Sequence, residues 1–111
     1  MVENEQKKIP MSIYEDTINH IHPLTLVEKM KTETLDIIDI REPSELKQLP
    51  FKGARNIPMN ILIEYHQEFL NKEDTYYILC HHGRRSYVVT EYLQNLGYTV
   101  INVLGGVDLV N

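Results

Sequence analysis

Short apolar runs alternate with amphipathic segments along most of the chain. The apolar runs predict strands, and the amphipathic segments between them predict helices. The predicted strands are residues 18–22, 35–40, 54–57, 76–79 and 100–104, and the predicted helices are residues 23–30, 44–49, 59–70 and 86–96. Strands that alternate with helices in this way are typical of an α/β fold with a parallel sheet and helices on both faces.

Several residues at the segment ends predict where helices start and stop. Ser44 and Ser86 are the residue types that cap helix N-termini, and Gly97 is suited to the position just after a helix. The last long helix is predicted to bury one apolar stripe, which consists of Val88, Val89, Tyr92, Leu93 and Leu96.

Length, charge and cysteine content narrow the class of protein. The chain of 111 residues has room for one domain, which we place at residues 13–111 after a polar N-terminal extension of residues 1–12. Met11 is an alternative start to Met1.

A formal charge of −5 argues against a general nucleic-acid or anionic-membrane surface. We find no apolar run long enough to span a bilayer and no secretory signal, and a lone cysteine forms no internal disulfide, so we expect a cytoplasmic protein.

The lone cysteine stands in a segment whose composition favours a reactive thiol. Cys80 ends the apolar run 76–79 and precedes His81, His82, Gly83, Arg84, Arg85 and Ser86, after which the helical pattern begins. A tight loop between a strand and a helix directs backbone N–H groups inward, and the helix dipole favours negative charge at its N-terminus. The thiolate is the nucleophilic form of cysteine, so this loop is a candidate anion-binding, catalytic loop.

The residues of this loop, and the charged residues after the second predicted strand, also have possible structural roles that involve no chemistry. A lone cysteine is commonly a small buried apolar residue. Adjacent histidines are expected to point in different directions without an acidic partner, so His81 and His82 predict no metal site. Arg84 and Arg85 either bind an anionic donor, or one of them turns inward to support the loop. Asp39, Arg41 and Glu45 follow a predicted strand and are expected to form a salt-bridged scaffold.

Four segments, taken together and in this order, resemble the single-domain rhodaneses, which are thiosulfate or persulfide sulfurtransferases. The four segments are Asp39-Ile40-Arg41-Glu42-Pro43-Ser44-Glu45, Gly53-Ala54-Arg55-Asn56-Ile57-Pro58, the loop from Cys80 to Ser86, and Gly97-Tyr98 with Val103-Leu104-Gly105-Gly106. The match covers about residues 20–108. Val110 stands where this family commonly has a tryptophan.

The resemblance implies a fold and a chemistry. The fold is a single rhodanese-like domain with a five-stranded parallel sheet in the order 1-5-4-2-3. Cys80 would take a sulfane sulfur from a small anionic donor, hold it as a persulfide and pass it to a thiol, sulfite or cyanide acceptor. Residues 81–86 would bind the donor, and Asp39, Arg41 and Glu45 would support the loop. No cofactor and no metal are required, and the donor or acceptor could also be a protein, with no nucleic acid and no membrane as partner.

Two other functions use the same fold. Cysteine-loop phosphatases and arsenate reductases need an arginine six positions after the cysteine, and here that position is Ser86. A non-catalytic interaction domain would typically lack the thiol, whereas Cys80 is present. The sequence therefore favours sulfur transfer over both alternatives.

Overall fold

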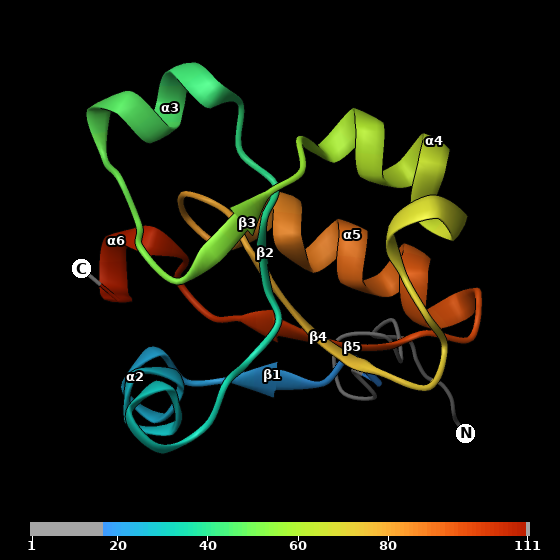
Figure 1. Ribbon diagram of the computed structural model, residues 1–111, viewed down its shortest axis with the longest axis horizontal. Coiled ribbons are helices and arrows are strands. Elements are labelled where there is room, and N and C mark those ends of the chain that lie inside the picture. The colour runs from blue at the N-terminus through green and yellow to red at the C-terminus, as the bar shows by residue number, and fades with distance from the viewer. Residues whose placement is uncertain (1–16, 111) are drawn as a thin grey trace, which may run out of the picture.

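Five parallel strands form one sheet in the computed structural model, which describes residues 17–110 (Figure 1). The strand order is β1-β5-β4-β2-β3, and every neighbouring pair is parallel. This confirms the predicted α/β architecture and strand order. The elements in chain order are β1 (His20–Ile21), α2 (Pro23–Thr32), β2 (Ile37–Asp39), α3 (Pro43–Gln48), β3 (Ala54–Asn56), α4 (Met59–Phe69), β4 (Thr75–Leu79), α5 (Arg84–Asn95), β5 (Thr99–Val103) and α6 (Val107–Val110).

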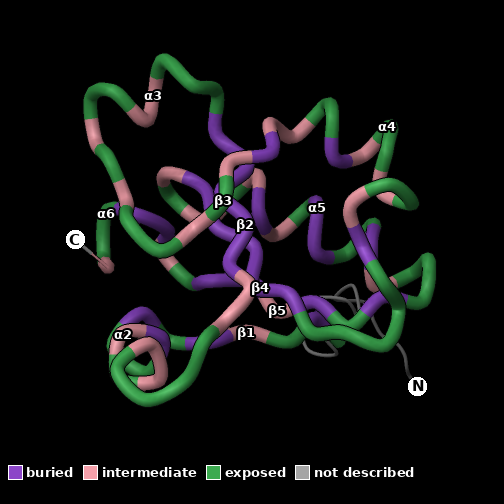
Figure 2. The backbone as a smooth tube through the Cα atoms, viewed as in Figure 1, coloured by how far each residue is buried: buried purple, intermediate pink, exposed green. Residues whose placement is uncertain are grey.

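The central strand β4 is buried on both sides because helices cover both faces of the sheet (Figure 2). Successive side chains of a strand point to opposite faces. Tyr76, Ile78 and Cys80 therefore pack in one apolar cluster, and Tyr77 and Leu79 pack in the other. This alternation places the thiol of Cys80 on the face that α5 covers.

Two helices contribute side chains to each apolar cluster. Leu62 of α4 and Val89 and Leu93 of α5 pack on the face that carries Cys80. Leu26 of α2 and Val107 of α6 pack on the opposite face. The sequence thus yields a three-layer domain, and the short helix α3 lies beyond the carboxyl end of β2 (Figure 1).

The structure corrects the predicted face of α5. Its buried residues are Ser86, Val89, Thr90 and Leu93, whereas Val88, Tyr92 and Leu96 of the predicted stripe are exposed. The true stripe follows the same helical period but is rotated about the axis, so that Ser86, which contacts Cys80, and Thr90 one turn later are buried. Gly97 does follow the end of this helix, with a φ of 101°.

The two predicted serine caps are wrong. Helix α3 is capped by Glu42, whose side chain accepts from the backbone of Glu45 while Glu45 accepts from the Glu42 N–H. Helix α5 is capped by Gly83 and starts at Arg84, so Ser86 lies inside the first turn. A capping box and a left-handed glycine replace the serines.

Two further findings concern membrane-spanning helices and the N-terminal residues. Among the described residues, none of the helices is both long and apolar enough for a membrane span. The predicted extension 1–12 and the alternative start at Met11 lie outside the described residues.

Candidate active site

The thiol of Cys80 lies at the carboxyl end of β4 and is almost completely buried. Its Sγ accepts hydrogen bonds from the backbone N–H of Gly83 at 3.1 Å and of Ser86 at 3.3 Å. The Ser86 hydroxyl is also 3.3 Å away and accepts from the thiol. That hydroxyl can rotate and donate once the sulfur is ionised. With the N-terminus of α5 beside it, this environment stabilises negative charge on sulfur.

Gly83 makes the tight turn of the loop possible. Its φ of 95° is left-handed, which side chains rarely allow, and it ends the loop just before α5. A Cβ at this position would also lie only 2.8 Å from the backbone nitrogen of Gly105. Two glycine-containing segments, one before α5 and one after β5, are therefore in direct backbone contact.

The start of α6 holds the outer side of the same loop. The N–H of Val107 donates to the carbonyl of Cys80 at 2.8 Å, and the N–H of Asp108 donates to the carbonyl of His81 at 3.2 Å. The loop carbonyls thus point outward to α6 while the N–H groups of Gly83 and Ser86 point inward to sulfur. A Cβ on Gly106 would collide with the carbonyl oxygens of Cys80 and His81.

Arg41 and Asp39 form a buried ion pair under the site. Arg41 donates to both carboxylate oxygens of Asp39, and its Nη1 donates to the carbonyl of Leu49 at 2.7 Å. The Asn56 amide donates to the backbone carbonyls of Asp39 and Arg41, at 2.8 Å each. These hydrogen bonds therefore hold the segment between β2 and α3.

The Arg85 guanidinium forms an ion pair with a second carboxylate, that of Glu45. Its two terminal nitrogens donate to the two oxygens of Glu45, at 2.8 Å each. The hydrogen bond from Arg85, together with the one from the Glu42 backbone, lowers the pKa of Glu45 to about 2, although partial burial opposes this shift. The hydrogen bond to Glu45 raises the pKa of Arg85 in turn. This pair joins the first turn of α5 to α3.

Arg84 differs from both of these arginines. It is exposed, and it has no hydrogen-bond or ion-pair partner among residues 17–110. The two arginines therefore differ in their contacts: Arg85 pairs with Glu45, and the Arg84 side chain has no such partner in the described part of the chain.

His81 and His82 do not diverge as the sequence analysis expected. Their rings stack with centroids 3.8 Å apart, and both contact the carboxylate of Asp108. The distances are 3.1 Å from His81 Nε2 and 2.6 Å from His82 Nδ1. They also have an acidic partner, since α6 brings Asp108 beside them from about 26 residues further along the chain.

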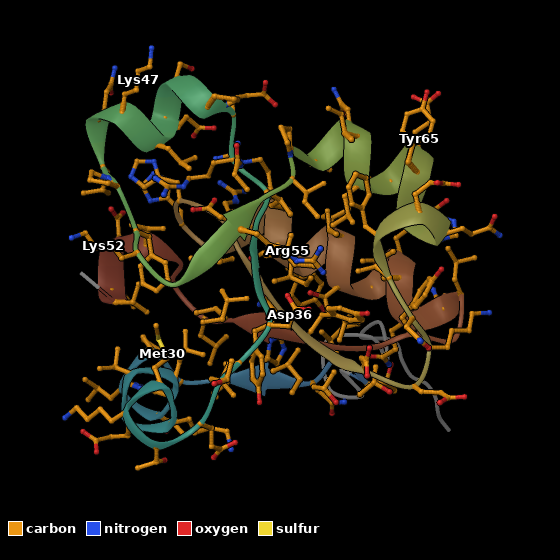
Figure 3. All side chains as sticks on the ribbon, viewed as in Figure 1. Met30, Asp36, Lys47, Lys52, Arg55 and Tyr65 are labelled. Atoms are coloured by element: carbon orange, nitrogen blue, oxygen red, sulfur yellow. The ribbon has the colours of Figure 1, made fainter. Side chains whose placement is uncertain are left out.

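A cavity of about 380 Å³ opens beside the loop. Arg41, Glu45, Gln48, Leu49 and His81 line it, so it lies between α3 and the residue next to Cys80. A larger hollow of about 470 Å³ lies at the opposite, amino-terminal edge of β2, where Asp36 pairs with Arg55 (Figure 3). We assign the site to the smaller cavity, because ligands of open α/β sheets bind at the carboxyl ends of the strands.

Three residues of this site were not among the site residues predicted from the sequence: Asn56, Gly106 and Asp108. The paired glycines 105–106 were a signal that the backbone approaches another segment closely there. Nothing in the sequence indicated the partner of Asp108, because that contact depends on how α6 returns to the loop.

The sequence profile of the rhodanese-like domain family matches residues 22–110. The chain belongs to the rhodanese-like domain family.

Relatives of rhodanese type cover most of the chain. It is 36% identical over 90 residues to the putative sulfurtransferase YtwF of Bacillus subtilis, a match that covers 80% of this chain and 86% of the relative. It is 34% identical over 92 residues to a sulfurtransferase of Allochromatium vinosum, covering 81% and 85%. The putative sulfur carrier protein YrkF of Bacillus subtilis is 37% identical over 75 residues, and there the match spans 67% of this chain but only 40% of the relative.

A solved structure agrees with these matches. The rhodanese-like domain protein from Staphylococcus aureus superposes with a TM-score of 0.77 at 32% identity, covering 85% of this chain and 92% of that chain. The rhodanese fold of this chain is thus supported by its own topology and by a structure of clearly related sequence.

The contact of Gly106 with the rhodanese loop predicts a specific cost for Gly106→Ala. We expect this variant to lose about 2–4 kcal/mol of stability in urea unfolding, because strain at a φ of 64° adds to a collision with backbone atoms. Gly97→Ala is the matched control: its φ is 101°, but a Cβ there meets only the flexible Lys72 side chain, at 3.5 Å. Equal losses in the two variants would contradict the proposed contact.

The Glu45–Arg85 pair predicts a pH-dependent stability. Because the pKa of folded Glu45 is about 2, its contribution is complete above the unfolded value of 4.5 and is lost as the pH falls toward 2. We expect Glu45→Gln to cost about 1 kcal/mol at pH 7, since both side chains are partly exposed. The difference from wild type should shrink between pH 4.5 and the acid limit of folding.

Urea unfolding at a series of pH values measures this effect. Glu64→Gln, which removes an exposed carboxylate of α4 without an ion pair in the described structure, serves as the control and should stay within about 0.5 kcal/mol of wild type. A Glu45→Gln cost that is the same at pH 2.5 and pH 7 would rule out the ion pair as its cause.

Proposed function

We propose that the protein is a rhodanese-type sulfurtransferase that moves a sulfane sulfur through a persulfide on Cys80. The observation that carries the proposal is the buried sulfur held by the backbone N–H groups of Gly83 and Ser86 at the start of α5. Relatives named sulfurtransferases, at 34–36% identity over most of their length, support the same activity.

The first half-reaction loads the enzyme. The Cys80 thiolate attacks the outer sulfur of thiosulfate or of a persulfide or polysulfide, and a new S–S bond forms. The old S–S bond breaks, and sulfite or a thiolate leaves with its electron pair. No proton transfer is needed in this step, because both the nucleophile and the leaving group are anions.

The second half-reaction returns the thiolate. A nucleophilic acceptor, such as a thiol, sulfite or cyanide, attacks the terminal sulfur of the persulfide, and the bond to Cys80 Sγ breaks. The N–H groups that face Sγ stabilise its charge before and after each step. Ping-pong kinetics follow from this sequence.

The charges beside the loop suit a small anionic donor. Asp39 and Glu45 neutralise Arg41 and Arg85, while Arg84 stands at the loop without a carboxylate partner among the described residues. We assign the approach of the donor to the cavity bordered by His81 and Arg41. Arg84 lines a neighbouring cavity of about 330 Å³ with Gly83, Tyr87 and Val88, so it would attract the anion from the other side of the loop. A protein donor or acceptor also fits the proposal, and one relative is named a sulfur carrier protein. We further propose that the protein acts in the cytoplasm, where a lone cysteine stays reduced.

Two other activities receive less support from the geometry. A phosphatase or arsenate reductase loop closes with an arginine around an oxyanion, but Ser86 occupies that position and Arg85 is turned to Glu45. A non-catalytic domain has no need of a thiol that accepts two backbone hydrogen bonds. Neither alternative is favoured by any specific feature of the site.

The proposed function predicts that a persulfide forms on Cys80. Incubation with thiosulfate should add one sulfur atom to the intact protein, and cyanide should remove it. Cys80→Ser should gain no sulfur and should transfer none to cyanide, while its circular dichroism spectrum stays that of wild type. Hydrolysis of a small aryl phosphate that depends on Cys80 would instead indicate a phosphatase.

The second prediction separates the two loop arginines. Arg84→Ala should raise the KM for thiosulfate about five- to tenfold and leave a donor without formal charge nearly unaffected, because one charge-assisted contact is lost. Arg84→Lys should restore much of the affinity. Arg85→Ala should lower kcat for both donors, since Glu45 then no longer holds the start of α5. Equal effects of Arg84→Ala on the two donors would refute a donor-binding role for Arg84.

A further inference from the structure

Four ligand atoms meet on the outer side of the active loop. They are Nε2 of His81, Nδ1 of His82 and the two carboxylate oxygens of Asp108. The nitrogen–oxygen distances are 3.1 Å and 2.6 Å, and one donor atom from each residue lies within 4.8 Å of the others. The side chains of His82 and Asp108 are 61% and 42% exposed, so the cluster is open to solvent.

We propose that His81, His82 and Asp108 form a binding site for a borderline divalent transition-metal ion of the zinc class. Two imidazoles and one carboxylate are ligands that zinc accepts, and tetrahedral ligands that lie about 2.0–2.1 Å from the ion are about 3.3 Å from one another. The His81–Asp108 distance of 3.1 Å is close to this value, and the ligand atoms that lie up to 4.8 Å apart would move together around the ion. Water would complete the coordination. This site does not include the Cys80 thiol, although His81 also borders the cavity that we assign to the donor. Zinc binding is measured without sulfur transfer, so the two proposals are tested independently.

The choice of ion follows from the ligands. Mg²⁺ and Ca²⁺ require mainly oxygen ligands, and here the carboxylate of Asp108 supplies the only oxygens of the cluster. Imidazole nitrogens favour zinc, nickel and copper ions instead.

The surrounding charges are compatible with a bound cation. The guanidinium groups of Arg41 and Arg85 are each paired with a carboxylate, and the chain carries a net charge of −5. Arg84 is the nearest cation in sequence without such a partner in the described part of the chain, and its charge opposes metal binding.

Binding would join two segments that already touch. His81 and His82 belong to the loop between β4 and α5, whereas Asp108 belongs to α6, whose N–H groups hold the carbonyls of Cys80 and His81. An ion bound to all three side chains would add a second connection between this loop and α6. It should therefore stabilise the folded chain by an amount that rises with the logarithm of the ion concentration once that concentration exceeds the Kd.

Calorimetric titration of ZnCl₂ into the Cys80→Ser protein tests the proposal. The serine removes the thiolate, which is itself a zinc ligand, and makes the readout independent of sulfur transfer. Variants His82→Asn and Asp108→Asn are made in this background. His22→Asn is the matched control: it removes an exposed histidine, and asparagine can still cap α2 as His22 does.

We expect one zinc per chain in the Cys80→Ser protein and in the His22→Asn control. Affinity should fall at least about tenfold in His82→Asn and in Asp108→Asn, because each loses a ligand. On addition of zinc, the amide resonances that shift should be those of residues 80–83 and 106–109. No saturable binding, equal affinity in all four proteins, or shifts centred on His20 or His66 would each overturn the site. If Cys80→Ser does not fold, Cys80→Ala serves as the background.

Discussion

The orientation of the peptide groups between Cys80 and Ser86 is the constraint on which this site depends. Two peptide groups of this loop direct the N–H of Gly83 and of Ser86 to the buried sulfur. Two others present the carbonyls of Cys80 and His81 to α6, where the N–H groups of Val107 and Asp108 donate to them. Buried carbonyls need such donors, and the glycines at 83, 105 and 106 allow the two backbones to approach. The surroundings of the Cys80 sulfur are thus a property of two segments rather than of its own loop.

The alternation of apolar runs predicted the sheet, the helices on both faces and the position of Cys80 at a strand end, because burial on two faces leaves a strong pattern in the sequence. The strand order came from the family resemblance, not from the pattern. Helix phase was harder to predict: the period of α5 was evident, but Val88 and Tyr92 are exposed while Ser86 and Thr90 are buried. Periodicity gives the width of an apolar face, whereas its direction depends on what the helix packs against.

Contacts over long sequence separations account for the remaining differences. The sequence could not divide the roles of Arg84 and Arg85, because the division depends on Glu45, which lies 40 residues earlier. It could not orient His81 and His82, because Asp108 reaches them from α6. The carboxylate–guanidinium pairs at Asp39 and Glu45 neutralise two of the three arginines near the site. The positive charge near the site that has no carboxylate partner in the described residues is therefore that of Arg84, whereas the sequence suggests a broader basic cluster.

The contact between the loop after β4 and the start of α6 also bears on the order in which the protein forms. Ribosomal synthesis releases the N-terminal strands first, yet β1 pairs only with β5, and the Cys80 carbonyl is bonded by Val107. A nascent chain that ends before residue 103 can pair β2, β3 and β4 but has neither the sheet partner of β1 nor the outer side of the loop. The thiol would gain its final environment only when the last part of the described chain emerges. Assembly of the site is thereby coupled to completion of the fold.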